Sequence, residues 1–114
     1  MKKRELKDCN PYNPPKHFNV TALSLQSKEE SGCEKFWMGL SHFLPDGGCD
    51  YDESQTEKIY FVVKGEITVC DKDKKKYILK ENDSIHISPG EGRSLKNETN
   101  LPVTMLVVMS YPDS

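Results

Sequence analysis

The chain has 114 residues, of which 35% are hydrophobic and 30% charged, and its formal net charge is −2 at pH 7. Compact domains commonly hold about 100–200 residues, so this length allows one domain and no second catalytic one. The 16 basic and 18 acidic side chains are scattered along the chain, which argues against a nucleic-acid partner because binding phosphates requires a basic surface.

A membrane partner is not expected either. The longest apolar runs have four or five residues, far fewer than the roughly 20 that cross a bilayer. The basic start, MKKRELKDC, is followed by PYNPPKHFN, which does not resemble a secretory signal. We therefore expect a cytoplasmic protein, in which the four cysteines, spaced without a C-x-x-C motif, are free thiols.

The first 19 residues contain three of the seven prolines, with Pro14 and Pro15 adjacent. Proline fixes φ and cannot donate a backbone hydrogen bond, so this segment predicts an extended arm that packs on a neighbour. We expect the arm to cover residues 1–19 and a single β-domain to cover residues 20–112.

From Val20 onward, short segments rich in β-branched and aromatic residues alternate with turn residues, which predicts many strands and almost no helix. The charged stretch Ser27–Glu30 is too short to form a stable helix by itself. The expected strands are Val20–Leu25, Lys35–Leu44, Lys58–Val63, Glu66–Cys70, Tyr77–Leu79, Ser84–Ile87 and Val103–Ser110.

Two of these strands, Lys35–Leu44 and Val103–Ser110, carry apolar residues on both faces, as strands buried on both sides do. The dipeptide Lys64-Gly65 predicts a tight hairpin with glycine at positive φ. Short strands at regular spacing in so short a chain favour a closed or folded-over antiparallel barrel. The expected core includes Trp37, Met38, Phe43, Met105 and Val107.

Two segments resemble the paired motifs of the cupin superfamily. The first begins with PDGG at Pro45 and continues to Gly65, similar to the family pattern P-G-G, H-x-H, E and G. The second begins with NDSIHISPGEGR at Asn82 and ends at Asn97, similar to G-D, a short apolar strand, P-x-G, H and N. The resemblance spans residues 39–109 and implies a small single-domain cupin of the cupin 2 type. Such proteins are all-β, with a double-stranded β-helix or jelly-roll barrel, a cavity in its lumen, and usually a dimeric assembly.

The resemblance also locates the family's metal ligands, normally His, His, Glu and His. In this sequence they fall on Asp52, Ser54, Lys58 and Arg93. A divalent metal needs lone pairs, which protonated Lys58 and Arg93 do not have. The chain is therefore expected to lack the usual metal ligands and to hold no metal cofactor. The alternative is a metal site rebuilt from Asp52, Glu57, His42 or His86.

Two cations in a barrel lumen need a negative partner. Either Asp52 bridges Lys58 and Arg93 as a structural staple, or the two cations hold an anionic ligand. Tyr60 shares the parity of Lys58 and is expected to line the same cavity. Further candidates for lining the lumen are His42, His86 and Met105.

We therefore expect metal-independent binding of a small carboxylate-like metabolite by Asp52, Ser54, Lys58, Tyr60 and Arg93. Two enzymatic alternatives stay open: an isomerase or lyase that uses Lys58 at a lowered pKa, and a metal-dependent cupin enzyme with a rebuilt site. Strands that are apolar on both faces also predict a homodimer, with the arm at or near the interface.

Overall fold

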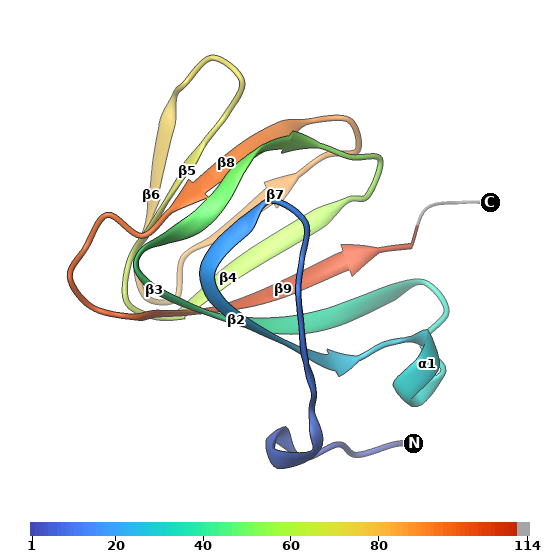
Figure 1. The fold of residues 1–114 in the computed structure, drawn as a ribbon. Helices are drawn as coiled ribbons and strands as arrows, with labels where there is room; N and C mark the ends of the chain where they lie inside the picture. Colours follow the sequence, from blue (N-terminus) through green and yellow to red (C-terminus); the bar gives the residue numbers. More distant parts are fainter. Residues whose placement is uncertain (112–114) are drawn as a thin grey trace.

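Nine antiparallel strands form one sheet that curls into a nearly closed barrel in the computed structural model, which describes residues 1–111 (Figure 1). The prediction of an all-β barrel is confirmed. The strands are β1 (Pro11–Tyr12), β2 (His17–Gln26), β3 (Phe36–Glu53), β4 (Lys58–Lys64), β5 (Ile67–Cys70), β6 (Lys76–Leu79), β7 (Ser84–Ile87), β8 (Gly92–Lys96) and β9 (Val103–Ser110). Two short helical turns, η1 (Leu6–Asp8) and α1 (Lys28–Ser31), complete the described elements.

Strand β3 joins the two walls of the barrel. Its first half pairs with β2 and β9, and its second half pairs with β8. The predicted strand ended at Leu44, but the real one continues through Gly47 and Gly48 to Glu53. Glycine is needed there because a Cβ on Gly48 would lie 2.0 Å from the carbonyl oxygen of Leu95. The PDGG segment is therefore a point of close contact between strands.

The predicted hairpin at Lys64-Gly65 is wrong. Strands β4 and β5 are not neighbours in the sheet, whose order is β6-β5-β8-β3-β9-β4-β7. Gly65 does adopt a positive φ of 93°, and a Cβ there would lie 2.9 Å from the carbonyl oxygen of Pro102. The turn carries the chain from one wall of the barrel to the other. The turn residues themselves would suit a hairpin equally well, so the local sequence does not distinguish the two connections.

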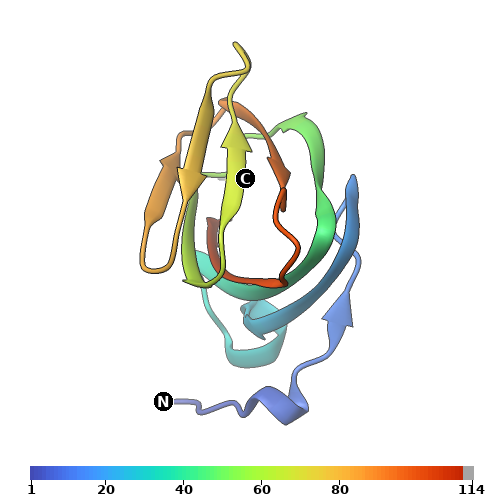
Figure 2. The same ribbon diagram turned by 90° about the vertical axis from the view of Figure 1, so that its left-hand side faces the viewer.

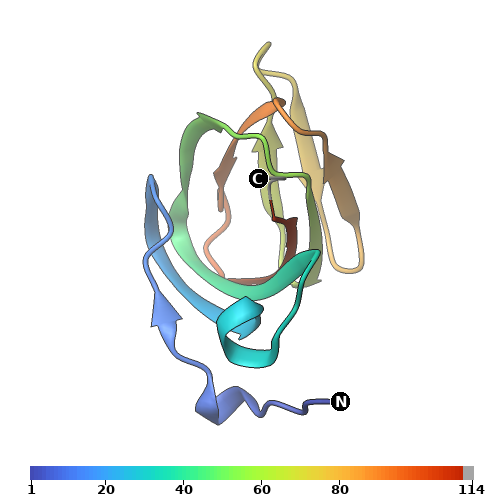
Figure 3. The ribbon, with the colours of Figure 1, turned by 90° about the vertical axis from the view of Figure 1, so that its right-hand side faces the viewer.

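The N-terminal segment lies along the outside edge of β2, as the end-on views show (Figures 2 and 3). Strand β1 pairs with β2 in the register Tyr12 to Ala22, and β2 itself already begins at His17. The last part of the predicted arm is therefore ordered sheet. Residue 112, the end of the predicted domain, lies outside the described residues.

Helix α1 is a single turn, capped by the Ser27 hydroxyl at its start and by Gly32 at φ 79° at its end. It is too short to persist alone. A tertiary contact holds it, because the backbone N–H of Lys28 donates to the hydroxyl of Tyr111 at 2.9 Å.

Alternate residues of each strand point into the barrel. The buried core includes Phe43, Met105 and Val107, as predicted, whereas Trp37 and Met38 are only half-buried. All four cysteines are free thiols, as expected. Among the described residues, none of the helical segments has the length and hydrophobicity that a membrane crossing requires.

Candidate functional site

The polar centre of the lumen consists of Lys58, Tyr60 and Arg93, which we call the lumen site. Lys58 and Tyr60 alternate with outward-facing Ile59 on β4, and Arg93 comes from β8 in the opposite wall. Their exposed fractions are 6%, 2% and 8%, respectively. The shared inward parity predicted for Lys58 and Tyr60 is confirmed.

Hydrogen bonds fix the three side chains. The Nε of Arg93 donates to the hydroxyl of Tyr60 at 2.8 Å. The ammonium of Lys58 donates to Oγ of Ser54 at 2.6 Å and reaches the carbonyl oxygen of Thr56 at 3.4 Å. Ser54 thus lies beside Lys58, as the motif spacing predicted, and its hydroxyl also bonds that of Thr56 at 2.7 Å.

Asp52 does not bridge Lys58 and Arg93, so the structural staple, one of the two alternatives left open by the sequence, is not formed. The expectation that Asp52 joins these two cations in the ligand-binding set is also wrong. Asp52 faces Arg93 in the β3–β8 register, but its carboxylate pairs with the ammonium of Lys16 at 3.1 Å on the surface. The backbone carbonyl of Lys16 accepts a hydrogen bond from the N–H of Asp50, which brings the Lys16 side chain over β3. This partner comes from the arm, whose path the sequence pattern did not specify.

The two cations of the lumen site therefore have no carboxylate partner among the described residues 1–111: none of the ion pairs there includes Lys58 or Arg93. Burial, helped by the nearby Arg93 charge, lowers the pKa of Lys58, the direction expected for a desolvated lysine beside a guanidinium. Burial also raises the pKa of Tyr60 and of the neighbouring thiol of Cys49. The phenol and the thiol therefore stay neutral at neutral pH, and neither balances the positive charge.

Two small cavities adjoin Arg93. One, of about 30 Å³, lies in the lumen and is closed on the arm side by Tyr12, Pro14 and His17. That volume is roughly the space one water molecule occupies in the liquid. The other, of about 130 Å³, lies beside β7 and β8, with the acidic residues Asp71 and Glu91 among its lining residues. Arg93 is thus buried and lines both cavities.

Sequence reasoning missed Tyr12, Pro14 and His17 as residues of the lumen. Nδ1 of His17 lies 2.7 Å from the carbonyl oxygen of Pro15, and burial lowers the pKa of His17. No motif marks these residues, because they belong to the irregular arm. The alternation along β2 would place His17 only if the start of that strand were known.

The three further candidates for lining the lumen lie in different places. Met105 lines the lumen cavity, as predicted. The prediction is wrong for His42, which faces outward and bonds the hydroxyl of Thr104 at 3.1 Å. His86 does not line the lumen cavity, but it lines the cavity beside β7 and β8 that adjoins Arg93, and its Nε2 lies 2.5 Å from a carboxylate oxygen of Glu57. Both histidines have the outward parity of their strands, since neighbours Phe43 and Ile87 face the core.

These residues do not fit a divalent metal. Of the four carried-over positions, Lys58 and Arg93 offer only protonated donors, and Asp52 is turned to Lys16. No three His, Cys, Asp or Glu side chains within residues 1–111 are grouped as ligands. The rebuilt site considered from the sequence is not assembled either. The structure brings Glu57 and His86 together, but Asp52 pairs with Lys16 and His42 bonds Thr104.

Known proteins resemble this chain in sequence and in fold. It is 33% identical over 112 residues to a beta-D-galactosidase of Mycobacterium tuberculosis, covering 98% of this chain and 96% of that protein. The polyketide cyclase RemF of Streptomyces resistomycificus superimposes with a TM-score of 0.85 and 18% identity, covering 96% of this chain and 79% of that one. A predicted oxalate decarboxylase of Thermotoga maritima superimposes with a TM-score of 0.78 and 20% identity, covering 98% of this chain and 100% of that one. At these identities the two structures show the shared fold alone.

The family follows from the sequence itself. Residues 39–109 match the cupin domain family, the same span over which the two motifs resemble its pattern. The chain belongs to the cupin family.

Proposed function

We propose that this cupin binds a small carboxylate at the lumen site without a metal ion. The observation that carries the proposal is the pair of buried cations, Lys58 and Arg93, that have no acidic partner among the described residues. Buried charges are costly unless paired. A bound carboxylate supplies the missing charge, and the planar guanidinium of Arg93 suits its two oxygens.

The cavities limit the size of this ligand. The space beside Arg93, about 30 Å³ on one side and about 130 Å³ on the other, is well below the roughly 300–1,000 Å³ of sites for drug-sized molecules. A carboxylate of a few heavy atoms therefore fits better than a larger metabolite. Charge-assisted hydrogen bonds contribute about 1.5–3 kcal/mol each, so a bidentate contact with Arg93 and one bond from Lys58 together give roughly micromolar-to-millimolar affinity.

Thermal denaturation with added ligands tests the proposal. Acetate, pyruvate and oxalate should raise the melting temperature at constant ionic strength, whereas the neutral analogue acetamide should not. The response should disappear in Arg93→Ala and persist in Asp52→Ala, because Asp52 pairs with Lys16 on the surface. An identical response in Arg93→Ala, or no response to any carboxylate in the wild type, would refute carboxylate binding at this site.

The mycobacterial relative favours a second candidate, hydrolysis of a β-galactoside. Most glycosidases place two carboxyl groups on either side of the scissile bond, and no carboxylate is hydrogen-bonded to Lys58, Tyr60 or Arg93 among residues 1–111. Release of nitrophenol from a nitrophenyl β-galactoside tests this candidate directly. Turnover that Arg93→Ala leaves unchanged would place the reaction outside the lumen site.

We also propose a symmetric homodimer built on the outer face of β2, β3, β9 and β4. The strand registers place Leu23, Leu40, Leu106 and Phe61 in one apolar row across this face. Beside that row, Ile59 remains 46% exposed and Val63 44%. A second copy would cover this surface. Light scattering should give the mass of a dimer, and Leu106→Lys should give that of a monomer; a wild-type monomer at micromolar concentration would refute the proposal.

A further inference from the structure

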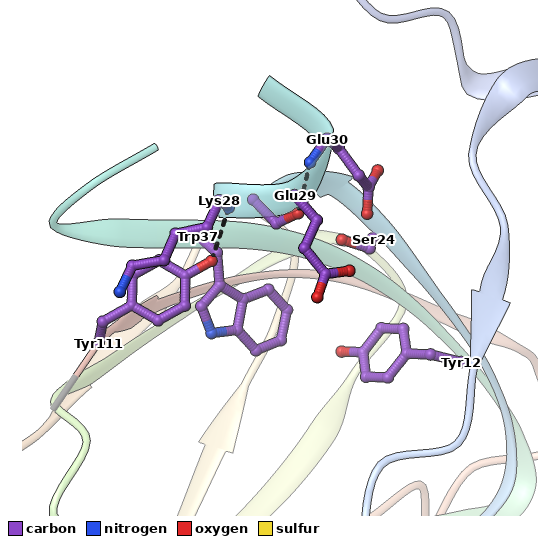
Figure 4. A pocket seen from close by; sticks show the side chains of 8 residues that line it. Tyr12, Ser24, Lys28, Glu29, Glu30, Trp37 and Tyr111 are labelled. Carbon is purple, nitrogen blue, oxygen red and sulfur yellow. Dashed lines mark hydrogen bonds between the residues drawn. The ribbon is translucent and has the colours of Figure 1, made fainter. Parts of the chain in front are cut away.

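A larger cavity than the two beside Arg93 lies on the inner face of the sheet (Figure 4), and it shares Tyr12 with the lumen cavity. Its volume is about 410 Å³, within the roughly 300–1,000 Å³ typical of small-molecule sites. We call it the outer pocket, and its lining residues are Tyr12, Ser24, Ser27, Lys28, Glu29, Glu30, Trp37 and Tyr111. Helix α1 covers it, and the tertiary bond from Lys28 to Tyr111 holds that helix in place.

Aromatic rings form part of the wall. Trp37 meets Tyr12 edge to face, with ring centroids 5.8 Å apart and an interplanar angle of 78°. Figure 4 shows the indole of Trp37 and the ring of Tyr12 below the carboxylate of Glu29. The ring of Tyr111 already carries the ammonium of Lys28, 4.4 Å from its centroid. Trp37 and Tyr12 are thus the rings left for a ligand.

Several polar groups around these rings have no partner within the part of the chain that the structure describes. No hydrogen bond there uses the carboxylate of Glu29, the hydroxyls of Tyr12 and Ser24, or the indole N–H of Trp37. The set includes donors and acceptors, spaced around one cavity. A ligand that both donates and accepts hydrogen bonds would satisfy it.

The charges of the outer pocket indicate a neutral ligand. Glu30 is neutralised by an ion pair with Arg4, which leaves the negative charge of Glu29 and the positive charge of Lys28 in the same cavity. Glu29 repels an anion, and Lys28 repels an organic cation, although aromatic rings with a carboxylate would otherwise suit a cation. From this balance, the aromatic faces and the mixed donors and acceptors, we infer that the outer pocket binds an uncharged sugar ring.

A sugar ring has the required chemistry. Its hydroxyl groups donate and accept hydrogen bonds, and its C–H faces pack on an aromatic ring. Glu29 would accept hydrogen bonds from neighbouring hydroxyls, and the hydroxyl of Tyr12 would bond another. This inference is independent of the carboxylate proposed for the lumen site, and it does not require hydrolysis, since binding alone satisfies it.

The single tryptophan of the chain is Trp37, which lines the outer pocket and not the lumen cavity, so tryptophan fluorescence reports on the outer pocket. Methyl β-D-galactopyranoside and methyl α-D-glucopyranoside, titrated separately at millimolar concentrations, should produce a saturable change for at least one of them. Tetramethylammonium should produce none. The absence of a saturable change with both sugars, or a response to tetramethylammonium in place of the sugars, would overturn the inference.

Variants that keep Trp37 locate the binding. Glu29→Ala should weaken sugar binding about tenfold to a hundredfold, the range for loss of a charge-assisted hydrogen bond, and Tyr12→Phe about threefold to tenfold. Glu34→Ala, at an exposed acidic residue outside the pocket lining, is the matched control and should bind as the wild type does. Weakening by Glu34→Ala equal to that by Glu29→Ala would contradict a site in the outer pocket.

Discussion

The lumen site and the outer pocket lie on the same inner face of the sheet, and Tyr12 lines the cavities of both. Their polar groups are arranged in opposite ways. In the lumen site, hydrogen bonds hold Lys58 and Arg93 while the charge stays unbalanced. In the outer pocket, Lys28 and Glu29 balance in charge, but the side chains of Glu29, Tyr12, Ser24 and Trp37 have no hydrogen-bond partner among the described residues.

Because of this difference, the lumen site and the outer pocket are suited to different kinds of ligand. A buried site with fixed donors and excess positive charge favours a small anion, because the ligand's charge is what the protein does not supply. An open cavity with balanced charge favours a ligand whose groups make many weaker, directional bonds. One curved sheet can therefore present two different chemistries on one face, depending on which strand ends and loops meet there.

The largest expected effect on stability comes from comparing the removal of one cation at the lumen site with the removal of one at the outer pocket. Replacement of a buried, unpaired charge by an apolar side chain of similar size is commonly stabilising, so Arg93→Met should raise the free energy of unfolding by about 1–3 kcal/mol, net of the bond lost by Tyr60. Lys28→Met, at an exposed cation, should change it by less than about 1 kcal/mol. Urea denaturation measures both. Destabilisation by Arg93→Met would mean that the charge of Arg93 is already stabilised in the protein without a ligand.

The pH dependence of stability should report the burial of Lys58. Because burial lowers the pKa of Lys58 in the folded state, the unfolded chain binds the extra proton between the folded pKa and the usual value of about 10.4. The free energy of unfolding that Lys58 contributes therefore rises with pH in that window. The wild-type curve minus that of Lys58→Met should show this rise. A flat difference curve would contradict a desolvated Lys58.

A smaller effect is expected at the arm side of the lumen. Burial lowers the pKa of His17, so the unfolded chain is the more readily protonated state below about pH 6.5. The free energy of unfolding should fall as the pH drops from 6.5 through the folded pKa, and His17→Gln should remove this part of the acid sensitivity. Equal acid sensitivity in His17→Gln would show that other groups cause it.

The smallest effect should follow from breaking the ion pair between Lys16 and Asp52. Exposed ion pairs contribute little to stability because water and salt screen them. Lys16→Ala and Asp52→Ala should therefore melt close to the wild type at physiological salt, and their difference from it should shrink further in high salt. A large loss in Asp52→Ala alone would revive the structural staple that the observed pairing contradicts.

The sequence predicted most strands of the barrel because their alternation is strong and local. It also placed Lys58 and Tyr60 on one face, since parity along β4 needs no knowledge of the rest of the fold. The hairpin at Lys64-Gly65 was wrong because one glycine turn serves a hairpin and a crossing between walls equally well. Strand β8 lay within the second motif but was not predicted as a strand, because the short run GRSLK carries little alternation.

The site was predictable only where the strands are regular. Arg93 and Ser54 followed from the family spacing, but the partner of Asp52 did not, because Lys16 lies in an arm whose course depends on tertiary contacts. The outer pocket was not predicted for the same reason. Its residues come from four separate segments, β1, β2 with α1, β3 and the residue after β9, which only the folded chain brings together.

The arm that closes the lumen is held to the barrel by very little secondary structure. Strand β1 has two residues, Pro11 and Tyr12, and pairs with β2 alone. Short edge segments open far more often than the whole protein unfolds. Release of this segment should therefore limit the rate at which a carboxylate enters the lumen from the arm side. The association rate constant should be well below the diffusion limit, and it should increase in variants that weaken the pairing of Tyr12 and its neighbours with β2.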